Sequence, residues 1–115
     1  MPARSRRRDA RRELDEIDAV FAGLAHASRR HILLVLLHHG GRMTAGEIAN
    51  RFDCAWPTTT RHLQKLESAG LVVVEPQGRE RVYRLNDALL REVVTNWIGH
   101  FAPRPVSGRA RGGSP

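Results

Sequence analysis

The chain has 115 residues, the length of one small domain. Its one cysteine excludes an internal disulfide framework and any four-cysteine zinc site within a single chain, and sparing use of cysteine is typical of the reducing cytosol. The longest apolar run, ILLVLL at 32–37, is too short to span a membrane, and the basic opening lacks the apolar core of a secretory signal. We therefore expect a cytoplasmic protein with no membrane partner.

The formal net charge of +7 is concentrated at the two ends of the chain. Residues 1–12 have six arginines and one acid, for a net charge of +5, and residues 102–115 have three arginines and no acid, for +3. Residues 13–101 have a net charge of −1. A DNA-binding function therefore depends on where charges lie within this near-neutral middle, and not on the total.

Composition also divides the chain into three parts. Residues 1–12 are predicted to form a disordered basic arm. Residues 103–115, PRPVSGRARGGSP, are predicted to form a disordered tail, because Pro, Gly, Ser and Arg dominate there. Residues 13–102 are predicted to form one domain.

The first two helices of this domain are predicted from their apolar residues. Over about 13–24, apolar residues recur at spacings of three and four and give one stripe. The next helix, over about 27–39, is apolar on nearly all sides and should be central and buried. Gly40 and Gly41 end it.

The third and fourth helices are predicted from their end signals. The third covers about 45–52 and starts with Thr44 and Glu47, which match a capping box. The fourth covers about 56–69 and has Pro57 in its first turn, where the missing N–H costs little. The inward face of the fourth helix is predicted to hold Thr59, Leu63, Leu66 and either Ala69 or Gly70.

Two strands and a last helix complete the domain. LVVVE at 71–75 and RVYRL at 81–85 are predicted to form a hairpin with Gly78 at its tip. The last helix covers about 87–101. The fold class is therefore mainly α with a small β-hairpin: a winged helix-turn-helix of about five helices and a two-stranded wing.

Two stretches carry a family resemblance. VFAGLAHASRRHILLVLLHHG at 20–40 has an apolar-A-L-A-x-x-x-R-R-x-I-L pattern, and MTAGEIANRFDCAWPTTTRHLQKLESAGLVVVEPQGRERVYRLN at 43–86 has the R-H-L-x-x-L-x-x-A-G-L-V run and a final Y-R-L. Over about 14–100 the chain resembles the ArsR-type bacterial repressors. The resemblance implies a cytosolic homodimer that binds an operator in double-stranded DNA and releases it when a signal arrives.

The chain departs from the family at several positions. The metal-sensing branch has cysteines in the third helix or Asp, His and Glu sets on the last one; here the third helix lacks cysteine, and the last offers Asp87 and His100 without a second histidine at useful spacing. No metal site or cofactor is therefore expected, and the effector stays unknown. His26-Ala27 replaces a frequent Asp-Pro, and Ala55-Trp56 replaces a usual Ser-Gln.

Side chains of the fourth helix and the hairpin are the candidate DNA contacts, because a helix fits the major groove and arginines suit a phosphate backbone or minor groove. The residues are Trp56, Thr58, Thr60, Arg61, Lys65, Arg79, Arg81 and Arg84. Arg61 could read a guanine edge or clamp a phosphate, and Thr60 could instead bond its own backbone. Trp56 could pack on DNA or fold back over the turn near Cys54. The hairpin arginines could also simply keep an edge soluble.

Apolar residues on the first and last helices are the candidate dimer interface, since they are too many for a chain of this size to bury completely. They are Leu14, Ile17, Phe21, Leu90, Val94, Trp97 and Phe101, hereafter the dimer seam. Ordinary core packing is the alternative for each. A two-fold dimer would place two recognition helices roughly 34–36 Å apart and predicts an inverted-repeat operator.

Two other classes of function compete with a repressor. A winged-helix module that binds protein without specific DNA binding is the alternative, and the arginines beside the fourth helix favour DNA over it. An enzyme has little support, because no nucleophile–base constellation or phosphate loop is present. Cys54, near a helix start, could be a redox switch or a small turn residue.

Overall fold

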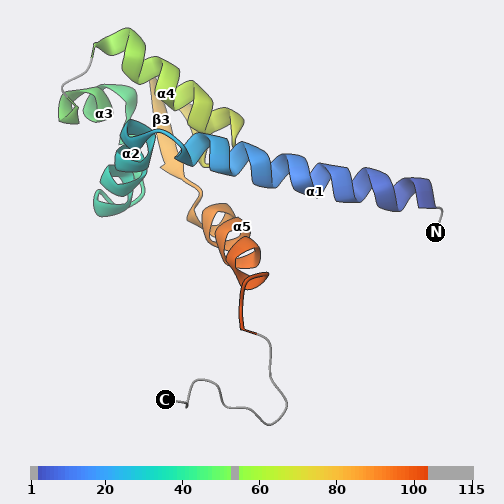
Figure 1. Cartoon of the computed structure of the whole chain (residues 1–115). Coiled ribbons are helices and arrows are strands. Elements are labelled where there is room, and N and C mark those ends of the chain that lie inside the picture. The colour runs from blue at the N-terminus through green and yellow to red at the C-terminus, as the bar shows by residue number, and fades with distance from the viewer. Residues whose placement is uncertain (1–2, 53–54, 104–115) are drawn as a thin grey trace, which may run out of the picture.

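The computed structural model describes residues 3–52 and 55–103, with side chains from residue 6 onward, and it has the expected mainly helical winged helix-turn-helix architecture (Figure 1). The elements in chain order are α1 (Ala3–Leu24), α2 (Ala27–His38), β1 (Arg42–Thr44), α3 (Ala45–Arg51), α4 (Trp56–Ser68), β2 (Val72–Gln77), β3 (Glu80–Leu85) and α5 (Asp87–Gly99). No single helix among the described residues is long and apolar enough to cross a membrane; α1 and α2 together reach the length but are bent by 91° where they meet.

Helix α1 starts about ten residues earlier than the sequence predicted. The expected disordered arm over residues 1–12 is, from Ala3 onward, the first half of a 22-residue helix that projects from the body (Figure 1). From Ala3 to Ala22 the helix contains no glycine or proline, and arginine and alanine are good helix formers. The predicted helix can therefore extend toward the N-terminus as far as Ala3. Residues 1–2 and the predicted tail from residue 104 lie outside the described residues.

The sheet has three strands and not two. The order is β1-β3-β2, with all pairs antiparallel, and Met43 of β1 lies opposite Tyr83 of β3. A three-residue strand gives too little alternation to detect in a sequence. The hairpin between β2 and β3 is as predicted, and Gly78 turns it with a positive φ of 62° that favours glycine.

The core lies where α2, α3 and α4 meet the sheet. Ile32 and Leu36 of α2, Ile48 of α3 and Leu66 of α4 are at most 2% exposed. Gly23 of α1 is buried, and a Cβ there would lie 3.1 Å from the Leu71 side chain and 3.3 Å from that of Ala69, so the C-terminal end of α1 packs closely against the residues that follow α4. This packing fixes α4 in place and leaves most of α1 in solvent.

The capping box of α3 is confirmed. Thr44 Oγ1 accepts a hydrogen bond from the Glu47 backbone N–H at 3.1 Å, and Glu47 Oε1 accepts one from the Thr44 N–H at 2.8 Å. Hydrogen bonding to the Glu47 carboxylate, first from the Thr44 backbone N–H and then from the Thr44 side chain, lowers the pKa of Glu47 below its ordinary value. By contrast α4 starts at Ala55 with no side-chain cap, and only Pro57 suits its first turn.

Candidate nucleic-acid interface

Helix α4 is held down by one face and presents the other to solvent. Thr59, Leu63 and Leu66 are all at most 2% exposed, which confirms the predicted inward face. Because residues at spacings of three and four share a helix face, Arg61 and Lys65 lie together on the opposite side, and both are exposed. An anchored helix with a free polar face is the geometry that fits a DNA major groove.

The first turn of α4 adds three further candidate contacts. Thr58 is exposed and Thr60 is half-buried. A backbone hydrogen bond was the alternative role for the Thr60 hydroxyl. Among the described residues, it is the Thr59 hydroxyl that makes such a bond, donating to the Ala55 carbonyl at 3.4 Å. Trp56 leaves 53% of its surface exposed and is not folded away into the core. Cys54 lies outside the described residues.

Two arginines have a role that the sequence did not reveal: they bind the last carbonyls of α1. Arg29 donates from Nε to the Gly23 carbonyl at 2.8 Å and from Nη2 to that of Ala22 at 3.0 Å. Arg30 donates from Nη1 to the Leu24 carbonyl at 2.7 Å. The C-terminal carbonyls of a helix lack intrahelical partners and carry partial negative charge, so cations suit them. The R-R pair therefore fixes the angle between α1 and α2.

Arg29 also reaches α4 through His62. Its Nη1 lies 3.4 Å from His62 Nδ1, and the rings of His62 and His26 have centroids 4.6 Å apart. His26 caps α2 by accepting the Ser28 N–H at its Nδ1, which supplies the acceptor that the family's aspartate would provide. Burial lowers the pKa of His62 below its ordinary value, and the neighbouring His26, Arg29 and Arg61 lower it further.

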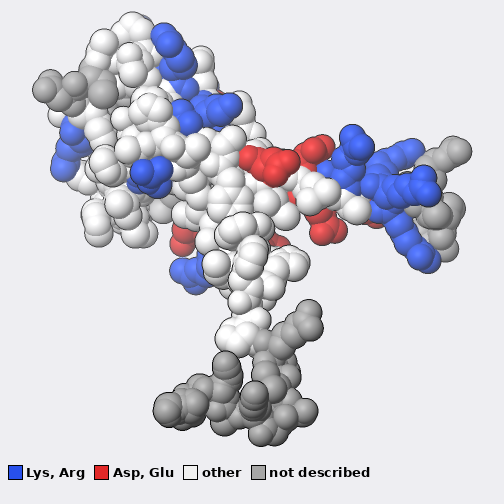
Figure 2. Space-filling view, viewed as in Figure 1, with Lys and Arg blue, Asp and Glu red and all other residues white. Residues whose placement is uncertain are grey.

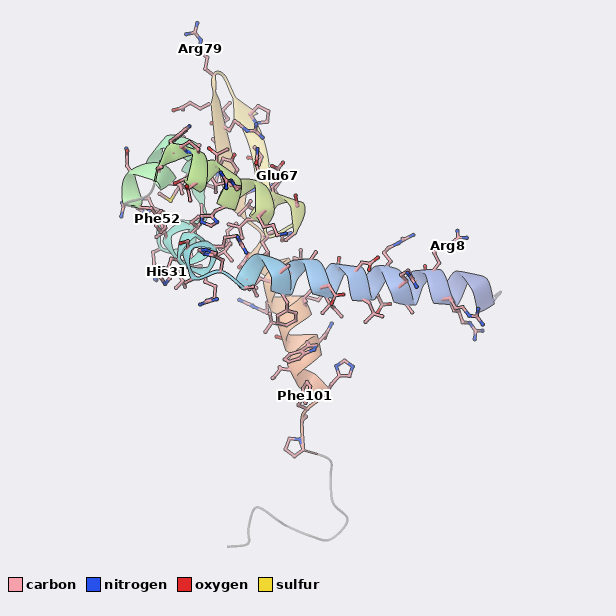
Figure 3. All side chains as sticks on the ribbon, turned by 45° about the horizontal axis from the view of Figure 1, so that its top comes forward. Arg8, His31, Phe52, Glu67, Arg79 and Phe101 are labelled. Carbon is pink, nitrogen blue, oxygen red and sulfur yellow. The ribbon has the colours of Figure 1, made fainter. Side chains whose placement is uncertain are left out.

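The hairpin, or wing (residues 72–85), places its arginines differently from one another. Arg79 stands at the tip and points away from the body (Figure 3). Arg81 lies 4.0 Å from Glu67 of α4, which puts it on the sheet face that α4 covers. Both arginines are exposed, so the wing tip and the outer face of α4 could contact one DNA duplex.

Arg84 does not join this group. It lies three residues from Arg81, and because strand side chains alternate, it belongs to the opposite face of the sheet. There it forms an ion pair with Glu75 at 3.0 Å, and Glu75 also lies 3.6 Å from Arg42 of β1. Its placement does not support the predicted DNA contact; it bridges strands at the base of the wing.

Charges along α1 are segregated. In the view of Figure 2, acids gather along the middle of the helix and separate the basic residues at its free end from those on the body. The acids are Glu13, Asp15, Glu16 and Asp18. The basic side chains are therefore concentrated at the body that carries α4 and at the far end of α1.

Residues of the dimer seam form two groups in the structure. Phe21, Trp97 and Phe101 form an aromatic row, with ring centroids 5.1 Å apart for the first pair and 4.9 Å for the second. Trp97 is 41% and Phe101 is 66% exposed, and Leu14 further along α1 is 60% exposed. Ile17, also on α1, is half-buried beside the core. Leu90 and Val94 are half-buried and line a groove between α2 and α5.

No group of three or more His, Cys, Asp or Glu side chains suited to a metal ion occurs within the described ranges 3–52 and 55–103. His100 is near Trp97, where its Nδ1 lies 3.3 Å from the backbone carbonyl. His39 contacts Arg51, with 2.8 Å between His39 Nε2 and Arg51 Nη2. His39 and His100 thus each lie close to a protein partner.

Comparisons with known proteins agree with this geometry. A family model described as a helix-turn-helix domain matches residues 24–75, which span α2 to the start of the wing. The chain is 35% identical over 82 residues to the transcriptional repressor SdpR of Bacillus subtilis (strain 168), covering 71% of this chain and 88% of SdpR. A mycobacterial relative, the HTH-type transcriptional regulator Rv2034 of Mycobacterium tuberculosis, is 33% identical over 94 residues. The matched region covers 82% of this chain and 85% of Rv2034.

Solved structures show the same architecture. The crystal structure of the ArsR family transcriptional regulator RHA00566 superimposes with a TM-score of 0.68 at 29% identity, covering 76% of this chain and 87% of that one. These relatives are regulators of transcription and not enzymes. The chain belongs to the ArsR family of winged helix-turn-helix transcriptional regulators.

Proposed function

We propose that this protein is a homodimeric repressor that binds an inverted-repeat operator in double-stranded DNA. The observation that carries the proposal is the outer face of α4: Thr58, Arg61 and Lys65 are exposed on a helix whose opposite face is fully buried. A rigidly held recognition helix positions its side chains against base edges at little entropic cost. Arg79 at the wing tip supplies a second, separate contact with the DNA backbone.

Within this face, Arg61 and Lys65 have different capacities. Arg61 can donate two parallel hydrogen bonds to a guanine edge, which would discriminate against other bases by about 1–3 kcal/mol, or it can clamp a phosphate. Lys65, a compact charge one turn further on, suits a phosphate. Thr58 can touch a thymine methyl group or a phosphate.

Support for a dimer comes from the exposed seam and from a relative. A winged helix-turn-helix domain of Mycobacterium bovis, a possible ArsR-family regulator, is homodimeric in solution; it has a TM-score of 0.62 and 27% identity, covering 76% of this chain and 81% of that one. A two-fold dimer contains two α4 helices, roughly 34–36 Å apart, related by the dimer axis. Each helix binds one half-site, so the two half-sites of the operator are in inverted orientation.

The test is selection of genomic fragments by the purified protein, followed by gel shifts on the enriched sequence. We expect an inverted repeat that is bound more weakly as salt rises. Arg61→Ala should abolish preference at one base pair of each half-site, or weaken all sequences equally if the contact is to phosphate. Arg84→Ala is the matched control, since it removes an exposed arginine from the opposite face of the wing.

A module that binds only protein is the rival, and it makes the opposite prediction. Failure to enrich any sequence and to bind DNA even at low salt would refute the repressor. Equal losses for Arg61→Ala and Arg84→Ala would refute the assignment of α4 as the reading face.

A further inference from the structure

An apolar groove of about 540 Å³ lies between α2 and α5. Leu34 and Leu37 of α2 line one wall and are each 52% exposed, and Leu90 and Val94 of α5 line the other. Sites for small molecules commonly enclose about 300–1,000 Å³ and have mainly apolar walls with a few polar groups that fix orientation. The groove therefore has the size and the walls of a small-molecule site.

The aromatic row of the dimer seam lies apart from this groove. On α5 the lining runs from Asp87 to Thr95, whereas Trp97 and Phe101 lie further along the chain and do not line it. The wall that α2 provides contains no residue of the dimer seam. A ligand can therefore enter the groove without displacing the aromatic row.

Two arginines line the groove, one from each wall. They are Arg30 of α2 and Arg91 of α5, and both are exposed. The acid in the lining is Asp87, so the lining has a net charge of +1. Among the residues described, neither arginine lies within 4.0 Å of a carboxylate. An apolar groove beside guanidinium groups without an acidic partner is complementary to a molecule with an apolar body and an anionic head.

We propose that the groove binds an amphipathic monocarboxylate. Its hydrocarbon chain lies between the apolar side chains of α2 and α5, and its carboxylate accepts hydrogen bonds from Arg30 and Arg91. Arg30 already donates from Nη1 to the Leu24 carbonyl at 2.7 Å, which joins α2 to the end of α1. The carboxylate competes for this guanidinium, because an ionised acceptor forms a stronger hydrogen bond than a carbonyl does. Ligand binding therefore loosens the junction of α1 and α2.

A change at this junction can reach the helix proposed to read DNA. Arg29, the neighbour of Arg30, binds the same end of α1 and contacts His62 of α4. Loosening the end of α1 therefore alters the support of α4. This consequence rests on the repressor proposed above: the carboxylate is then its effector, and it lowers the affinity for the operator.

Titration calorimetry of the full chain with dodecanoate, below the concentration at which it forms micelles, measures the binding. We expect saturable binding that tightens by up to about fourfold for each methylene added between octanoate and dodecanoate, because the groove removes the chain from water. Two probes with the same chain are controls: dodecanol lacks the charge, and dodecyltrimethylammonium reverses it. Both should bind at least about tenfold more weakly than dodecanoate.

Substitutions on the two walls show whether the groove is the site. Leu34→Glu places a carboxylate one helical turn from Arg30, where it occupies the guanidinium and repels the ligand, so dodecanoate should bind at least about tenfold more weakly. His31→Glu is the matched control, because His31 is exposed on α2 and does not line the groove; affinity should change by less than about twofold. Arg91→Gln leaves the apolar walls intact and should remove most of the preference for dodecanoate over dodecanol.

Two results would overturn the site. One is equal affinity for dodecanoate, dodecanol and dodecyltrimethylammonium, which would make the groove an unselective apolar surface. The other is an equal loss of affinity in Leu34→Glu and His31→Glu. Calorimetry needs no DNA, so a protein that binds dodecanoate but no operator would refute the repressor and leave the site standing. Unchanged operator affinity in gel shifts at saturating dodecanoate would refute the coupling through Arg30.

Discussion

Replacing Arg29 with alanine should both destabilise the fold and weaken DNA binding, because its side chain joins the end of α1 to α4. The side chain binds the last carbonyls of α1 and contacts His62 on α4. The substitution removes these bonds at once and leaves the half-buried Gly23 carbonyl without its partner. Helix α1 then loses its fixed direction relative to the recognition helix.

The magnitude follows from the bonds that are lost. A hydrogen bond from a charged donor contributes about 1.5–3 kcal/mol when shielded from water, and this range applies to the bond to Gly23. The bond to Ala22 is exposed, so its contribution is at most about 0.5–1 kcal/mol. We therefore expect Arg29→Ala to lower the free energy of unfolding by roughly 2–3 kcal/mol. Arg29→Lys should recover less than half, because one ammonium cannot reproduce the planar fork.

Urea unfolding at one fixed protein concentration measures this loss, since dimerisation makes the apparent stability depend on concentration. Arg51→Ala is the control: its side chain is exposed and, among the described residues, its bond is to His39, so the loss should be below about 0.5 kcal/mol. A loss for Arg29→Ala no larger than that of the control would refute the role given to this arginine.

Three further predictions concern the two ends of the chain and pH. Trp97→Ala should lower dimer affinity, as it removes the centre of the aromatic row; an unchanged sedimentation profile would exclude a seam role. Deleting residues 1–10 should weaken DNA binding and flatten its salt dependence if the basic end of α1 contacts phosphates; identical salt slopes would mean that it does not. Because the folded state lowers the pKa of His62 below 6.5, its contribution to stability is complete above pH 6.5 and is lost as pH falls through the lowered pKa. The stability of the wild type should then drop more steeply below pH 6.5 than that of His62→Gln in parallel urea titrations, and parallel curves would contradict the assignment.

Residue periodicity was sufficient to predict the helices and the buried side of α4. Leu63 and Leu66 repeat at helical spacing, and Gly70 stops the helix, so the inward face followed from local rules. The start of α1 was mispredicted because charge was taken to mean disorder, whereas arginine favours helix. Strand β1 was missed because it is a strand only through its pairing with β3, which lies about forty residues further along the chain.

Side-chain partners across the fold were harder to predict. The R-R pair was visible in the sequence, but its role depends on where α1 ends and how α2 turns back, which are tertiary facts. The odd spacing of Arg81 and Arg84 within a strand already places their side chains on opposite faces of the sheet, while a DNA contact by either stays a prediction. The carboxylate of Glu75, which binds Arg84, could not be identified without the strand register.

The two tryptophans give each proposed interface its own optical probe. Trp56 stands in the first turn of α4 with 53% of its surface in solvent, and Trp97 lies in the aromatic row of the seam. Since the chain has only these two, Trp97→Phe leaves an emission that reports on DNA, and Trp56→Phe leaves one that reports on the partner subunit. Binding and assembly can thus be followed separately in one solution, without a label.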